Sequence, residues 1–240
     1  MSNNYFQFKQ FTIHQERCAM KVCTDACLFG AYIARELFGR QLAPGNILDI
    51  GTGTGLLSLM VAQKTNGIID AIEIDGAAAQ QAKQNFEQSP WNNRLNIFKT
   101  DALLFNPGKK YDCIISNPPF FEGDLKSGNK KRNAAKHDTT FTLEQLLSVI
   151  GRHLLPHGFF GILLPCQRVN LFVEIATAAH YFLNGQLLIQ HTGGHQFFRG
   201  ILFFSHHNTT IIRNELAIKD ENGNYTHNFI ELLEDYYLNL

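Results

Sequence analysis

Four consecutive residues near the middle of the chain, Asn117-Pro118-Pro119-Phe120, have types that could activate a planar amine. An amino group conjugated to a ring or a carbonyl is a poor nucleophile because its lone pair is delocalised. The Asn117 side-chain oxygen and the Pro118 carbonyl could accept its two N–H bonds and favour a tetrahedral nitrogen as charge develops. Phe120 could stack on the planar group and orient it. The motif therefore predicts transfer of a methyl group to a conjugated nitrogen.

A glycine-rich segment, Asp49-Ile50-Gly51-Thr52-Gly53-Thr54-Gly55, follows an apolar run and precedes another. Its Gly-x-Gly-x-Gly spacing lacks the third glycine of a dinucleotide fingerprint, since Leu56 stands at that position. Neither Lys nor Arg occurs within the segment, which suits an adenosine ligand without a pyrophosphate. We therefore expect this loop to hold the adenosine-containing methyl donor S-adenosylmethionine, with S-adenosylhomocysteine as its product.

Two carboxylates that follow later strands extend this predicted cofactor site. Glu73 stands about 20 residues beyond the loop, where an acidic side chain can accept both ribose hydroxyls. Asp101 could accept a hydrogen bond from the adenine amino group, whereas Asp75 is expected to cap the next helix. Among the residues expected to bind the cofactor are Asp49, Gly51, Thr52, Gly53, Gly55, Glu73, Ile74, Asp101, Ala102 and Asn117.

The elements that must position these residues alternate between strand and helix from residue 47 onward. Strands buried on both faces read as apolar runs, which indicates a parallel sheet. The strands are expected at 47–50, 68–74, 95–98, 111–116, 159–164, 186–191 and 200–205. The helices are expected at 24–39, 56–63, 77–88, 143–155 and 168–182, with a further short strand at 216–218 and a terminal helix.

The last two strands of this series are separated by a segment too short for a crossover helix, so they must pair antiparallel. We therefore predict an α/β, Rossmann-like methyltransferase fold, in which a seven-stranded, mostly parallel sheet ends in an antiparallel hairpin and carries helices on both faces. A single domain is expected over residues 1–240. Residues 1–23 would form an N-terminal hairpin or extension, and residues 24–240 the catalytic core.

Composition places few limits on the partner. Lys plus Arg and Asp plus Glu both number 21, so net charge predicts neither nucleic-acid nor membrane binding. No leader-like segment or membrane-length apolar run is present, and a cytoplasmic location is expected. The five cysteines lack the spacing of a zinc site, and the histidines are interpreted as surface or core residues, so no metal is predicted.

Local charge after the catalytic motif is strongly basic. Only Glu122 and Asp124 oppose it before Asp138. A phosphate-contacting loop is the favoured interpretation, and a solvated lid is the alternative. The residues expected to contact nucleic acid are Lys126, Lys130, Lys131, Arg132, Lys136 and His137. The motif itself leaves three acceptors open: adenine N6 in DNA or RNA, guanine N2 in RNA, and a protein glutamine amide.

Several segments spread over the chain resemble the bacterial tRNA adenine-N6 methyltransferases that modify adenine 37 of a valine tRNA. The matching segments are Phe8–Phe11, Arg17–Val22, Thr24-Asp25, Asn117–Phe121, Ala135–His137 and the closing Tyr236–Leu238. Cys23 and Cys27 depart from the pattern, because small residues such as Gly would be expected there.

The resemblance implies that Lys21, Thr24 and Asp25 border the methionine end of the cofactor. It also implies a folded tRNA that enters through its single-stranded anticodon loop, where a purine is reached with little unpairing. No membrane and no obligate protein partner are expected. The alternatives are a protein glutamine N5-methyltransferase, an rRNA guanine-N2 methyltransferase, and an RNA-binding module that retains a cofactor fold without catalysis.

Overall fold

A computed structural model describes residues 3–18, 20–39, 45–118 and 141–240 of the chain. Its elements in chain order are β1 (Tyr5–Gln7), β2 (Thr12–His14), α1 (Thr24–Gly39), β3 (Asn46–Ile50), α2 (Leu56–Ala62), β4 (Ile68–Glu73), α3 (Gly76–Glu87), η1 (Asn92–Arg94), β5 (Leu95–Lys99), β6 (Tyr111–Ser116), α5 (Leu143–His153), β7 (Leu154–Pro165), α6 (Cys166–Ala178), β8 (Phe182–Thr192), β9 (Arg199–Ser205), β10 (Ile212–Lys219) and α7 (His227–Leu233).

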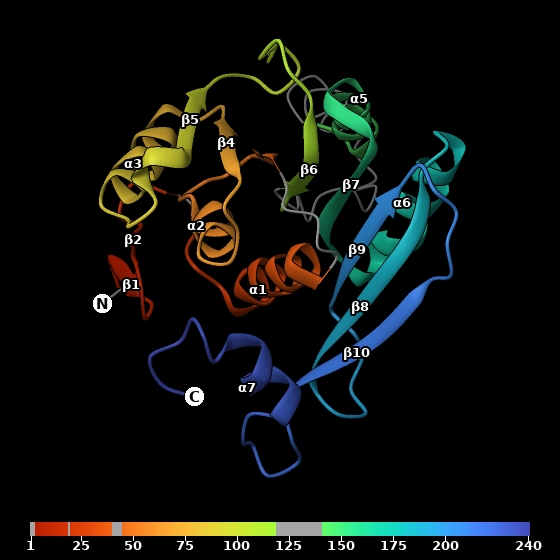
Figure 1. Ribbon diagram of the computed structural model, residues 1–240. Helices are drawn as coiled ribbons and strands as arrows, with labels where there is room; N and C mark the ends of the chain where they lie inside the picture. The colour runs from red at the N-terminus through yellow and green to blue at the C-terminus, as the bar shows by residue number, and fades with distance from the viewer. Residues whose placement is uncertain (1–2, 19, 40–44, 119–140) are drawn as a thin grey trace, which may run out of the picture.

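The main sheet has the strand order β10-β8-β9-β7-β6-β3-β4-β5 (Figure 1). The five strands from β7 to β5 pair parallel to one another. Strand β9 runs antiparallel to both β7 and β8, as its short connection to β8 predicts. The α/β fold and its antiparallel terminal hairpin are therefore confirmed.

Helices cover both faces of this sheet, and each face has its own apolar core. One core packs α1, α2, α3 and α7 against alternate strand residues such as Ile47 and Ile115. The other packs α5 and α6 against the intervening residues, for example Leu48 and Ile114. Because neighbouring strand residues point to opposite faces, a strand buried on both sides must be apolar throughout. This explains the continuous apolar runs that predicted the sheet.

Side-chain caps fix the start of several helices, including the one that Asp75 was predicted to cap. Thr142 and Gln145 form a reciprocal capping box at the start of α5. Asp75 accepts a hydrogen bond from the Ala78 N–H at the start of α3. Thr226 caps α7 in the same way. These caps satisfy backbone donors that the first turn of a helix leaves without partners.

The structure differs from the sequence-based expectation in three places. β10 joins the sheet as an eighth strand parallel to β8, whereas only a short strand near its end was expected. α6 ends at Ala178 and not at residue 182, since His180 adopts a φ of 62° that no helix continues. β7 begins at Leu154, directly after α5 ends at His153, whereas the helix was expected to reach residue 155 and the strand to start at residue 159.

The N-terminal segment forms the expected antiparallel hairpin of β1 and β2. Asn85 of α3 holds it in place, because its side chain accepts from the His14 N–H and donates to the His14 carbonyl. The Lys9 N–H donates to the Tyr236 carbonyl, so both ends of the chain meet on one side of the molecule (Figure 1).

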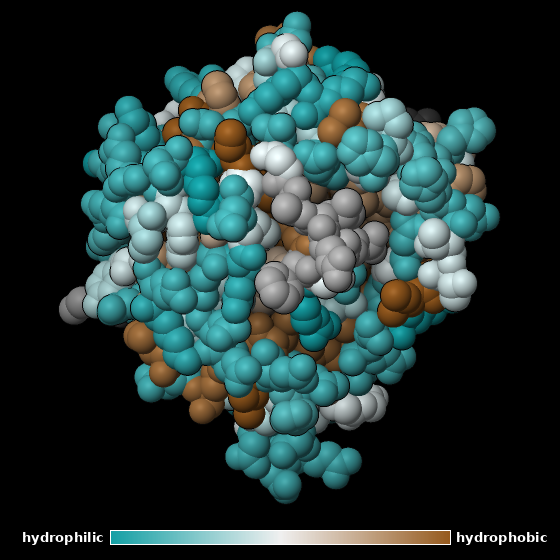
Figure 2. Space-filling model, viewed as in Figure 1, coloured by the Kyte–Doolittle hydropathy of each residue, from teal (hydrophilic) through white to brown (hydrophobic). Residues whose placement is uncertain are grey.

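The surface offers no extended apolar face on the side shown in Figure 2, where hydrophobic residues occur in small separate groups. Among the helices of the described residues, none combines the length and apolar character needed to cross a membrane.

Candidate active site

The glycine loop between β3 and α2 bends in a way that requires glycine. Gly51, Gly53 and Gly55 have φ values of 72°, 57° and 84°, a region that side chains disfavour. A Cβ built on Gly51 or Gly53 would meet no atom within 4 Å, so the loop backbone borders open space there. At Gly55 a Cβ would lie 2.5 Å from the Phe86 ring, so this glycine serves packing. The first two glycines therefore leave room for a ligand against the backbone.

Asp49 supports this loop from inside the protein. Its side chain is fully buried, and one oxygen accepts hydrogen bonds from Thr52 Oγ1 at 2.6 Å and Ser58 Oγ at 2.7 Å. Its other oxygen has no partner among the described residues. Burial raises the pKa of the Asp49 carboxyl to about 6, although the two hydroxyls act against this shift. Asp49 therefore fixes the shape of the loop at the cost of a buried carboxylate.

Glu73 stands at the end of β4, beside the loop. One carboxylate oxygen accepts from the Gly53 N–H and the other from the Asp75 N–H, both at 2.9 Å. Burial, together with the negative charges of Glu73 and Asp75, raises the pKa of the Cys18 thiol to about 11, which places the N-terminal segment close by. Ile74 follows with 66% of its surface exposed. An acidic acceptor and an exposed apolar side chain thus lie together at this strand end.

Asp101 and Ala102 lie in the turn that follows β5, and both are half-buried. One Asp101 carboxylate oxygen accepts from the Leu103 N–H at 2.8 Å, and the Asp101 carbonyl accepts from the N–H groups of Leu104 and Phe105. Strand β5 neighbours β4, so the turn continues the row of strand ends beyond Glu73.

Asn117 and Pro118 follow β6, on the other side of β3 from Glu73. Ser116 Oγ donates to the Ile50 carbonyl at 2.9 Å, which ties the end of β6 to the start of the glycine loop. The Asn117 Oδ1 atom is buried and accepts no hydrogen bond from any described residue. A buried acceptor without a donor is costly unless something else supplies one. Pro119 and Phe120 lie outside the described residues.

The residues at the start of α1 have different surroundings. Lys21 is exposed, and its ammonium donates to the Asn3 carbonyl at 3.2 Å. Thr24 is the first residue of α1. Asp25 accepts from Arg199 Nε of β9 at 2.7 Å, and this ion pair is mostly shielded from solvent. The residues predicted to contact nucleic acid, namely Lys126, Lys130, Lys131, Arg132, Lys136 and His137, lie outside the described residues.

The sheet order explains which predicted residues come together. Parallel strands end at the same edge, so this edge carries in succession Asp101 after β5, Glu73 after β4, the glycine loop after β3 and Asn117 after β6.

Three contributors were not predicted from the sequence: Ser58, Asn85 and Arg199. Asn85 could have been found, since it occupies a buried position at helical spacing from Ala78 and Ala82. Asp25 and Arg199 are 174 residues apart, and no spacing rule joins them.

In the described part of the chain, no three His, Cys, Asp or Glu side chains lie close enough together to hold a metal ion. None of the five cysteines forms a disulfide.

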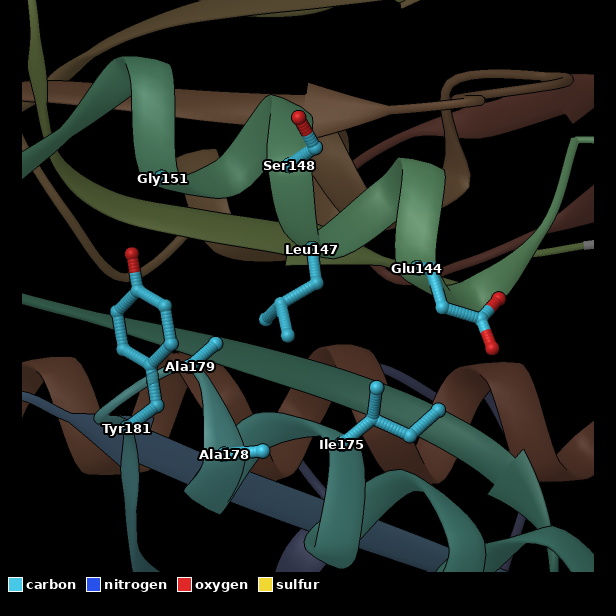
Figure 3. A pocket seen from close by; sticks show the side chains of 8 residues that line it. All are labelled: Glu144, Leu147, Ser148, Gly151, Ile175, Ala178, Ala179 and Tyr181. Carbon is cyan, nitrogen blue, oxygen red and sulfur yellow. The ribbon is translucent and has the colours of Figure 1, made fainter.

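Two cavities open elsewhere on the described surface. One, of about 490 Å³, lies between α5 and α6, where Leu147, Ile175 and Ala178 line its middle and Glu144 and Tyr181 its ends (Figure 3). None of the predicted site residues lines it. The other, of about 540 Å³, includes Thr24, Asp25 and Arg199 and lies at the same sheet edge as the site described above.

Known proteins similar to this chain are methyltransferases. A family model described as the methyltransferase small domain matches residues 24–145. A tRNA1(Val) (adenine(37)-N6)-methyltransferase of Dyadobacter fermentans is 44% identical, with 98% of each chain aligned. A protein of the same name from Bacteroides fragilis is 37% identical over the full length of both chains.

A solved structure confirms the fold at lower sequence similarity. The crystal structure of a predicted O-methyltransferase from Agrobacterium tumefaciens superposes with a TM-score of 0.68 at 16% identity, covering 90% of this chain and 100% of that one.

Proposed function

The chain belongs to the family of tRNA1(Val) (adenine(37)-N6)-methyltransferases, and we propose on this premise that it methylates N6 of adenine 37 in a valine tRNA. S-adenosylmethionine is the methyl donor of this reaction. Full-length relatives support the proposal, since their alignment includes both the N-terminal segment and the C-terminal end of the chain.

The described residues fit S-adenosylmethionine. Gly51 and Gly53 leave open space beside the loop backbone, and the Glu73 carboxylate stands at the adjacent strand end with two acceptor oxygens. Carboxylates in this position accept ribose hydroxyls in related α/β folds. The exposed Ile74 side chain offers an apolar surface for adenine, and Asp101 a carboxylate for its amino group. When bound, the cofactor supplies an electrophilic methyl group carried on a sulfonium.

Asn117 provides the observation that carries the proposed mechanism. Its Oδ1 is buried and accepts no hydrogen bond from a described residue, beside the loop that would hold the cofactor. The N6 amino group of adenine brings two N–H donors. We assign one to Asn117 Oδ1 and the other to the Pro118 carbonyl, so that the amino nitrogen becomes tetrahedral while its lone pair attacks the methyl group.

The proton of the methylated nitrogen leaves only after transfer. Nitrogen becomes strongly acidic once it carries four bonds, so a strong general base is not required. Asn117 and Pro118 would hold that proton until water removes it. Phe120 is assigned the role of stacking on the adenine ring and holding the amino nitrogen in line.

Substrate selection would depend on tRNA structure near the site. We assign phosphate contacts to Lys126, Lys130, Lys131, Arg132, Lys136 and His137. Adenine 37 belongs to the anticodon loop, where bases are unpaired and can be extruded at low cost.

The deciding experiment supplies isotope-labelled S-adenosylmethionine with unmodified total tRNA or with a protein extract, followed by digestion and nucleoside or amino-acid analysis. Label in N6-methyladenosine, located at position 37 of a valine tRNA, is the expected result. Label in N2-methylguanosine or in methylglutamine would assign the chain to one of the other acceptors, and cofactor binding without transfer would indicate a non-catalytic module.

A further inference from the structure

The 540 Å³ cavity lies at the carboxyl edge of the sheet, on the opposite side of β6 from the glycine loop. Its walls come from the start of α1, the end of β8, the start of β9 with the residue before it, the end of β10, and Tyr225 before α7. Thr24 and Asp25, which the family resemblance places at the methionine end of the cofactor, line one wall of this cavity. The remaining lining includes side chains that have no role in the proposed cofactor site or methyl-transfer step, namely His191, Phe198, Lys219 and Tyr225. Its composition is informative because flat rings and cations occur together.

Aromatic rings form one part of the lining. The His191 and Phe198 rings stack with centroids 4.1 Å apart and planes only 2° apart. His191 is exposed and Phe198 half-buried, so this pair presents flat ring surface to the cavity. Tyr225 is 41% exposed and stacks on the buried Phe229 at 4.6 Å, which fixes its orientation. Fixed, partly exposed rings are the platforms on which unpaired nucleobases stack.

Two cations flank these rings. Arg199 lies 5.5 Å from the Phe198 ring centroid and is held there by Asp25. The Lys219 ammonium lies 5.6 Å from the Tyr225 ring centroid, and no ion pair joins it to a carboxylate of the described residues. Cations beside aromatic rings suit a nucleotide, because phosphate and base then meet groups of matching chemistry.

The cavity lies within reach of the methyl-transfer site. Strand β9 is two strands from β6, and β8 is three. At about 4.8 Å between neighbouring strands, these steps correspond to roughly 10 to 14 Å from Asn117. Strand β10, which carries Lys219, is four strands from β6 and so lies at roughly 19 Å. Nucleotides adjacent to an extruded adenine fall within such a distance along an extended strand.

We propose that this cavity binds a second unpaired nucleotide of the RNA substrate, close in sequence to the methylated adenine. Its base stacks on the His191–Phe198 pair, and its phosphate pairs with Lys219. The inference rests on the proposed function, because it assumes that the strand whose adenine reaches Asn117 is RNA.

His191→Ala and Lys219→Ala test this proposal by steady-state kinetics with unmodified tRNA. Loss of one base stack is worth about 1–3 kcal/mol, so His191→Ala should raise KM for tRNA about 5-fold to 100-fold. The kcat at saturating tRNA and the Kd for the cofactor should stay unchanged. Lys110→Ala is the matched control, since Lys110 is an exposed lysine before β6 at the opposite sheet edge.

A fluorescence experiment reports stacking directly. An anticodon stem-loop RNA carries 2-aminopurine one or two positions from the target adenine, and stacking on a ring quenches its emission. Quenching by the wild-type protein that is lost in His191→Ala supports the proposal. If both variants quench the fluorescence as strongly as the wild-type protein and have its KM for tRNA, the proposal is overturned. If the wild-type protein methylates no adenine in RNA, the proposed function fails, whereas the quenching result still reports on the cavity.

Discussion

At the scale of single residues, Asn117 is central to the proposed methyl transfer. Its side-chain oxygen is buried and lacks a donor among the described residues, an arrangement that costs stability in the free protein. Such an acceptor is useful if it meets its donor only when substrate arrives. Its hydrogen bond should then strengthen as positive charge develops on the nitrogen.

Replacing Asn117 by Ala should lower kcat by about 10²-fold or more, by analogy with the loss of an oxyanion-type hydrogen bond. The Kd for S-adenosylmethionine, measured by calorimetry, should change little because the glycine loop and Glu73 remain. Asn222→Ala removes an exposed turn asparagine and serves as the control. Turnover by Asn117→Ala at the wild-type rate would remove Asn117 from the mechanism.

Asp49 has a pH-dependent effect on stability. Burial raises the pKa of its carboxyl to about 6 in the folded protein, compared with 3.8 for the unperturbed group. The folded state therefore binds this proton more tightly than the unfolded state. The resulting stabilisation is fully present below about pH 4 and is lost as pH rises through 6.

Asp49→Asn should remove this dependence while keeping an oxygen for the Thr52 and Ser58 hydroxyls. The wild-type unfolding free energy should fall relative to that of the variant between pH 4 and above 6, by on the order of 3 kcal/mol. Urea unfolding at several pH values measures the difference, and Glu221→Gln, at an exposed carboxylate, should reproduce the wild-type curve. A difference independent of pH would contradict this interpretation of Asp49.

At the scale of elements, the end of β4 shows how position separates two similar side chains. Glu73 still belongs to the strand and turns toward the glycine loop, where it accepts from Gly53. Asp75, two residues later, turns back to cap α3. The same chemical group therefore contacts the glycine loop in one case, where we propose that it binds the cofactor, and caps a helix in the other.

Glu73→Gln should weaken S-adenosylmethionine binding by about 10-fold or more, since a hydrogen bond to a charged group is worth about 1.5–3 kcal/mol. Asp75→Asn should leave the affinity nearly unchanged, because Asn is also a good helix cap. Isothermal titration of both variants with the cofactor measures the contrast. Equal losses of affinity in the two variants would place the ribose contact elsewhere.

Several of the strands predicted from the sequence are buried on both faces of the sheet. Strands such as β3 and β6 are apolar on both faces, so their sequences identify them without tertiary information. β10 was largely missed, because its first four residues are exposed and its only continuous apolar run is Leu216 to Ile218. β10 is an edge strand that pairs only with β8. Its pairing with β8 therefore holds it in the sheet, although most of its sequence lacks the apolar pattern of a strand.

The candidate site divides in the same way. Asp49, Gly51 and Glu73 were predicted because the glycine loop and the strand ends follow local rules. The Asp25–Arg199 pair could not be predicted, since it depends on how the start of α1 lies against the start of β9. The 540 Å³ cavity likewise joins segments from both ends of the chain, and only the folded structure brings them together.

At the scale of the whole molecule, the sheet order arranges the proposed steps along one edge. The residues proposed to bind the cofactor follow β5, β4 and β3, and those proposed to activate the amine follow β6. The cavity proposed for a second nucleotide lies at β9, β8 and β10. A substrate strand laid along this edge would meet the methyl donor at one end and a stacking platform at the other. Positive charges that strengthen tRNA binding would therefore need to lie near this edge and not over the entire surface.

The basic residues that follow the Asn117 motif are predicted from the sequence to contact tRNA phosphates, in a chain with no net charge at pH 7. Replacing Lys130, Lys131 and Arg132 by Gln should weaken tRNA binding and reduce the slope of log K against log salt by roughly 2 to 3, because each phosphate contact contributes about 0.7–0.9. Filter binding between low and moderate salt measures both quantities. Lys83→Gln on α3 is the single-charge control. An unchanged slope with unchanged affinity would mean that the loop covers the site without touching phosphate, so that the cations at the cavity would carry the tRNA contacts.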